Sequence, residues 1–178
     1  MVSLPVLFWM FVFLFAIIGA SRGWAKEILV TFSSVLALFI VNLMQTYVPF
    51  FLPDSGLSPT TRFWIQSFVV GGLAFFGYQT ANIRAIVGER LVRERLQDTL
   101  LGFIIGAING YLIVGTIWFF MDRTGYPLLP YIAPPDSDDA LGRAAISMVE
   151  KMPPAFLQPP WVYFAVAVAF LFVVIIFV

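Results

Sequence analysis

The sequence predicts an all-α membrane protein, a polytopic helical bundle with about five transmembrane helices. The chain has 178 residues, of which 61% are hydrophobic and 11% are charged, and its mean hydropathy is +0.94. A soluble domain carries about 25% charged residues. A helix that crosses a bilayer needs about 17–25 mostly apolar residues. Five stretches meet this length, over 4–20, 28–47, 63–83, 99–120 and 161–178.

The composition excludes several classes of function. Cysteine and histidine are both absent, and the formal net charge is zero. Without these side chains there are no disulfides, Cys/His zinc sites, His-ligated haems, or Ser–His and Cys–His catalytic pairs. A chain with zero net charge also lacks the basic field that attracts nucleic acid. We therefore expect no catalytic residue, no metal, no cofactor and no nucleic-acid partner, and we expect a protein that is not an enzyme.

The first two stretches are joined by the short segment 21–27, so we expect them to form a tight antiparallel hairpin. Gly23 suits the left-handed residue that ends a helix. Glu27 then falls in the first turn of the second helix, where a negative charge interacts favourably with the helix dipole. We expect Arg22 and Lys26 to lie at the lipid phosphates or to pair with Glu27.

The third and fourth stretches are joined by 84–98, which we expect to form a charged helix in the plane of the inner leaflet. Asp98 is expected to cap the fourth helix. Asn109 is the most deeply placed strongly polar residue, and it either bonds to another helix or lines a pore. No charged residue lies at mid-membrane depth in the predicted spans, which disfavours a proton-driven carrier.

Small residues recur on one face of the fourth stretch and form a flat stripe against which another helix packs closely. The stripe consists of Gly102, Gly106 and Gly110. The facing surface is expected from one of two sets, either Gly71, Gly72 and Gly77 or Gly19 and Gly23.

A long loop, 123–160, separates the four-span core, residues 1–122, from the fifth stretch, 161–178. Apolar residues recur in this loop at helical spacing, which predicts a short amphipathic helix capped by Asp138 and ending before Pro153. We expect it either to cover the bundle or membrane surface or to dock a partner.

The distribution of basic residues predicts the orientation. Six of the ten lie in 21–27 and 84–98, which two spans place on one side of the membrane. Cytoplasmic loops carry the excess of Lys and Arg. Both segments are therefore predicted to be cytoplasmic, with the N-terminus outside and the C-terminus in the cytoplasm. Basic residues there also favour contact with anionic membrane lipids.

The two connections together resemble the colicin V production protein family over roughly residues 5–122. The first carries Arg22-Gly23-Trp24-x-Lys26-Glu27, which is similar to the family's Arg-Gly-aromatic-x-basic-Glu pattern. The second, Asp98-x-x-Leu101-Gly102-x-x-x-Gly106-x-x-x-Gly110 followed by Asp122, resembles a second family pattern. Two features differ: Asn109 stands where members often have a basic residue, and the fifth span extends a family usually considered four-spanning.

The resemblance implies a bacterial inner-membrane protein without known catalysis, required for export of one bacteriocin and linked to envelope maintenance. We therefore expect a non-enzymatic protein in envelope homeostasis or accessory to export. Two alternatives are a structural subunit of a larger respiratory, photosynthetic or secretory complex, and a passive channel or small-solute transporter. Other membrane proteins, in a homo-oligomer or a larger complex, are the expected partners.

The candidate functional residues all lie in or beside the two connections. They are Arg22, Gly23, Trp24, Lys26, Glu27, Asp98, Gly102, Gly106, Asn109 and Gly110. As a hypothesis, Arg22 or Lys26 pairs with Asp98 or Glu27 and clamps the two hairpins together.

Overall fold

The computed structural model describes residues 3–52, 55–79 and 95–177, and these residues form helices and no strand. The predicted all-α class is confirmed. The helices are α1 (Leu4–Arg22), α2 (Trp24–Tyr47), the short 3₁₀ helix η1 (Pro49–Phe51), α3 (Pro59–Tyr78), α5 (Arg95–Arg123), α6 (Ala140–Val149), α7 (Pro153–Phe156) and α8 (Trp161–Phe177).

Among the described helices, α1, α2 and α5 are long and apolar enough to cross a membrane. Helix α3 has 20 residues and α8 has 17, and neither is among the candidate spans. The count of five spans therefore stays a prediction, although the chain is a membrane protein. Within 84–98, residues 84–94 lie outside the described residues, and so does most of the expected in-plane helix.

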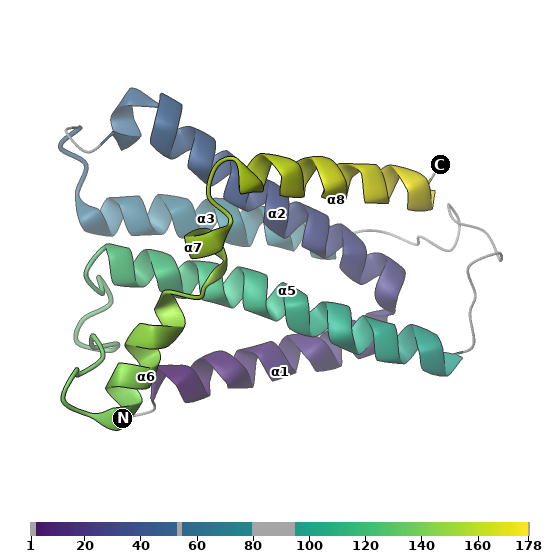
Figure 1. Cartoon of the computed structure of the whole chain (residues 1–178), viewed down its shortest axis with the longest axis horizontal. Coiled ribbons are helices and arrows are strands. Elements are labelled where there is room, and N and C mark those ends of the chain that lie inside the picture. The colour runs from purple at the N-terminus through teal and green to yellow at the C-terminus, as the bar shows by residue number, and fades with distance from the viewer. Residues whose placement is uncertain (1–2, 53–54, 80–94, 178) are drawn as a thin grey trace.

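The first two helices do not form the tight hairpin that their short connection predicts. Only Gly23 separates α1 from α2, and its φ of 86° is one that glycine adopts readily. From this residue the helices diverge: α1 packs mainly along α5, while α2 packs against α3, α5 and α8 (Figure 1). The prediction that α1 and α2 pack side by side is therefore wrong. Helix α1 packs along α5 instead, because the small residues of α5 allow a close approach of these two helices.

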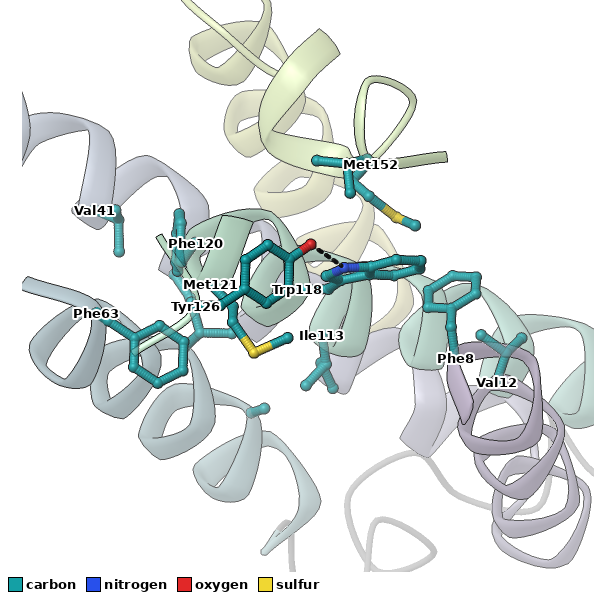
Figure 2. Close-up of a cluster of buried hydrophobic side chains, with 14 of the residues drawn as sticks. Phe8, Val12, Val41, Phe63, Ile113, Trp118, Phe120, Met121, Tyr126 and Met152 are labelled. Atoms are coloured by element: carbon teal, nitrogen blue, oxygen red, sulfur yellow. Dashed lines mark hydrogen bonds between the residues drawn. The ribbon is translucent and has the colours of Figure 1, made fainter. Parts of the chain in front are cut away.

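Large side chains fill the core near the ends of α1 and α5 that lie beside α6 (Figure 2). Phe8 of α1 packs against Trp118 of α5, with ring centroids 5.7 Å apart. The Trp118 indole N–H donates to the Tyr126 hydroxyl at 3.4 Å. Burial raises the pKa of Tyr126 to about 12, so this hydroxyl keeps its proton and donates to Asp122. The segment after α5 is thereby fixed to the bundle.

The loop between α5 and α8 contains the predicted amphipathic helix, now seen as α6. Its N-cap residue is Asp139, so the prediction of Asp138 as the cap is wrong. The backbone carbonyl of Asp138 instead accepts from the Arg143 guanidinium at 2.9 Å. Ala145 and Val149 are buried, and α6 packs on α1 and α5. The helix covers one end of the bundle.

Candidate functional site

The most unusual residue of the structure is Glu27, a carboxylate with 0% of its surface exposed. It lies in the first turn of α2, as predicted, where the helix dipole favours a negative charge. The sequence predicts this position in the helix but not its burial, and the fold encloses Glu27 between helices. A buried carboxylate is stable only when charged or hydrogen-bonding groups surround it.

The cation that pairs with Glu27 comes from the end of α1. The Arg22 Nε lies 3.4 Å from the Glu27 Oε1, and the Arg22 side chain is 18% exposed. The guanidinium also lies over the ring of Tyr78, 4.4 Å from its centroid, and donates to the Tyr78 carbonyl at 3.1 Å. One guanidinium thus joins the ends of α1 and α3 to the start of α2, through an ion pair, a cation–π contact and a hydrogen bond.

Asn109 supplies the contact from α5. Its Nδ2 donates to the Glu27 Oε2 at 2.8 Å and to the Glu27 carbonyl oxygen at 2.9 Å. Its Oδ1 accepts from the Thr31 hydroxyl at 2.7 Å. The interhelical bonding expected of Asn109 is present. Because Asn109 is 0% exposed and both ends of its amide are engaged, it lines no pore in this structure.

Tyr78 completes this polar group by donating its hydroxyl to the Glu27 Oε2 at 3.4 Å. We call the group the Glu27 cluster. It comprises Arg22 of α1, Glu27 and Thr31 of α2, Tyr78 of α3 and Asn109 of α5.

The glycine stripe of α5 faces α1. A Cβ added at Gly106 would lie 2.5 Å from the Phe15 carbonyl oxygen and 2.9 Å from the Gly19 Cα. One added at Gly110 would lie 2.8 Å from the Phe15 Cβ, and Gly102 is in similarly close contact with Gly19. Such distances require glycine at these positions of α5 and at Gly19 of α1, because a Cβ there would push the helices apart. This contact holds Asn109 at the depth of Glu27.

Of the two expected facing surfaces, the one that includes Gly19 is correct. The other set was wrong: a Cβ at Gly71 or Gly72 would meet nothing within 4 Å, so neither faces the stripe. Gly77 packs instead on α2, where an added Cβ would lie 2.7 Å from the Ser33 hydroxyl. Spacing alone predicts a packing stripe, but it does not specify which helix covers it.

Asp98 links the two connections through the backbone. Helix α5 already includes Asp98 in its first turn, so the prediction that this residue precedes and caps the helix is wrong. Its Oδ1 instead accepts from the backbone N–H of Trp24 at 3.1 Å, capping the start of α2. A Cβ at Gly23 would lie 2.8 Å from the same carboxylate. Gly23 is therefore needed both for its positive φ and for this close approach.

The hypothesis of a clamp between the two hairpins is correct for one of its ion pairs, that of Arg22 with Glu27. The contacts that join the hairpins differ from those expected. Arg22 and Glu27 both belong to the first connection, 21–27, so their ion pair does not join the two hairpins. The links from α5 to this connection are Asn109 and Asp98, which bond to α2. Lys26 is half-buried and forms no ion pair with any residue that the structure describes.

The donors and acceptors of the Glu27 cluster are directed at one another. Glu27 Oε1 has only its ion pair, without a hydrogen bond, and its Oε2 accepts two hydrogen bonds. Among the described residues no group of three His, Cys, Asp or Glu side chains could hold a metal ion. What the arrangement achieves chemically is to neutralise a buried carboxylate while joining four helices.

Sequence reasoning did not single out Thr31 and Tyr78. Thr31 lies four residues after Glu27, a spacing that places both on one face of a helix, and this was a usable signal. Tyr78 lies near the end of an apolar stretch and resembles an interfacial aromatic residue. Its role depends on α3 ending beside Arg22, which no local pattern predicts.

The comparisons with known proteins identify one family. The family model described as Colicin V production protein matches residues 4–134, a range that includes both connections and the Glu27 cluster. No curated protein and no solved structure matches the chain.

Proposed function

The chain belongs to the colicin V production protein family, and from this membership we propose that it is a non-enzymatic protein of the bacterial inner membrane. We propose that it acts in envelope homeostasis or as an accessory to export. The family match over residues 4–134 is the observation that carries this proposal.

The Glu27 cluster supports a scaffolding role. Burying a carboxylate is costly unless it is paired and hydrogen-bonded, and here three other helices supply the partners. Such a joint fixes the relative positions of α1, α2, α3 and α5 where both connections meet. A rigid core of this kind presents its outer surfaces to other membrane proteins or to a second copy, which are the partners that we propose.

The proposed orientation places the Glu27 cluster on the cytoplasmic side. It rests on the six basic residues in 21–27 and 84–98, against four on the opposite side. In this orientation α6 and α7 lie on the outer side, and both the N-terminus and the α5–α8 loop face the periplasm. The proposed C-terminus is cytoplasmic.

The proposed function is tested in a bacterial strain from which the gene has been removed. Entry of a dye that an intact envelope excludes and secretion of a colicin V-type bacteriocin are both measured. Wild-type protein should restore both properties, whereas Asn109→Leu should restore them only weakly. The matched control is Gln66→Leu, the same kind of change at a buried carboxamide outside the cluster.

A deletion strain with normal dye exclusion and normal secretion contradicts the proposal. Purification in mild detergent distinguishes the structural-subunit alternative. Stoichiometric partners of a respiratory, photosynthetic or secretory complex that co-migrate with the chain would favour a subunit over an envelope or export accessory.

A further inference from the structure

A cavity of about 190 Å³ lies away from the Glu27 cluster, between the second half of α2, the end of α5 and the segment that leads into α8. A single water needs only about 10–15 Å³ of such space. The cavity is lined by the carboxamides of Asn42, Gln45 and Gln158 and by apolar side chains that include Leu38, Phe119 and Leu157. Its size and mixed lining fit part of an organic molecule.

The lining specifies the chemistry of that molecule. No charged side chain lines the cavity, and carboxamides both donate and accept hydrogen bonds. Three carboxamides beside apolar walls suit a ligand with uncharged carbonyl or hydroxyl groups next to a hydrocarbon chain.

The position of the cavity along the helices gives its depth. Helix α2 has 24 residues, and at about 1.5 Å per residue it is longer than the hydrocarbon core of about 30 Å. Its end therefore reaches the headgroup layer. Asn42 lies about 7 Å before that end, and Phe119 lies about 6 Å before the end of α5. Both distances place the cavity at the boundary between headgroups and hydrocarbon.

A cation lies next to the cavity. The Arg123 guanidinium is positioned over the ring of Phe119, 4.9 Å from its centroid, and Phe119 lines the cavity. Arg123 is exposed. Arg123 is thus a cation in contact with a wall residue of the cavity, and a guanidinium pairs well with phosphate.

We propose that this cavity binds the glycerol backbone of one membrane glycerophospholipid. The carboxamides donate to its ester carbonyls, the apolar wall contacts the first methylenes of an acyl chain, and Arg123 binds its phosphate. From the hydrocarbon core outward, a phospholipid carries the acyl methylenes, then the ester carbonyls and then the phosphate. The site is independent of the proposed envelope or export role, since a lipid can be retained whatever the protein does.

The test is native mass spectrometry of the purified full chain after detergent exchange in the presence of phosphatidylglycerol. We expect wild-type protein to retain one lipid, and Asn42→Leu and Gln158→Leu each to lower the retained fraction at least five-fold. Arg123→Gln should lower it as well. The controls make the same changes at exposed sites that do not line the cavity, Gln79→Leu and Arg143→Gln, and they should retain lipid like the wild type.

Gln158 is exposed and lies outside the helices, so its replacement tests the site even if Asn42→Leu disturbs folding. Circular dichroism verifies the helical content of each variant. Equal lipid retention by Gln158→Leu and Gln79→Leu overturns the proposal, because it means only non-specific lipid around the bundle. Equal retention by Arg123→Gln and Arg143→Gln overturns the assignment of the phosphate.

Discussion

Replacing Asn109 with leucine is the sharpest test of the Glu27 cluster. Leucine is similar in size to asparagine, so the change removes hydrogen bonds without leaving a large cavity. Two donations to Glu27, at 2.8 and 2.9 Å, and one acceptance from Thr31, at 2.7 Å, are lost. The Glu27 Oε2 then keeps only the hydroxyl of Tyr78 at 3.4 Å.

The expected loss follows from these three bonds. A neutral hydrogen bond contributes about 0.5–1.5 kcal/mol net, and one to a charged group about 1.5–3 kcal/mol. Between helices in a bilayer the average is about 0.6 kcal/mol and the maximum about 1.7 kcal/mol. With the membrane values for the three bonds, we expect Asn109→Leu to lower the free energy of unfolding by about 2–5 kcal/mol.

The assay is reversible unfolding in mixed micelles, followed by circular dichroism. The control is Gln66→Leu, which removes a carboxamide whose buried Nε2 has no hydrogen-bond partner among the described residues. We expect it to be neutral or stabilising, since an unsatisfied buried group costs free energy. A double-mutant cycle with Thr31→Val should give a coupling of about 0.5–1.5 kcal/mol. An Asn109→Leu protein as stable as Gln66→Leu would refute the reasoning.

Three further changes test the packing and the orientation. Gly106→Ala should destabilise the bundle by about 1–3 kcal/mol because the added Cβ meets the α1 backbone. Its control is Gly71→Ala, which adds a Cβ in open space and should be neutral or stabilising in the same unfolding assay. Asp98→Ala should cost about 1 kcal/mol by removing the cap of α2, and unchanged stability would count against that role. The chain lacks cysteine, so an impermeant thiol reagent on intact cells should label Ser147→Cys but not Ser21→Cys, and the reverse pattern contradicts the proposed orientation.

The sequence contains enough information to predict the class of fold and the location of the candidate site. Long apolar runs have to be helices in a membrane, because a helix satisfies its own backbone groups. Gly23 and Glu27 were placed correctly because their roles at a helix junction are local. The spacing of Gly102, Gly106 and Gly110 is likewise local, and it predicts a packing stripe of α5.

The facing partners of these residues depend on which helices become neighbours. The short connection predicts that α1 packs along α2, yet α1 packs along α5. That choice follows from the match between Gly19 and the stripe, a contact of two surfaces more than 80 residues apart in the chain.

The sequence by itself therefore determined that the chain is a helical membrane protein of a known family and that its two connections carry the distinctive residues. Only the tertiary structure decided that Asp98 caps α2, that Glu27 is buried, and that Tyr78 and Asn109 bond to it. The physical reason is one of range. Helix formation depends on neighbours within a few residues, whereas the Asp98 cap and the buried charge depend on groups that other helices bring within hydrogen-bonding distance.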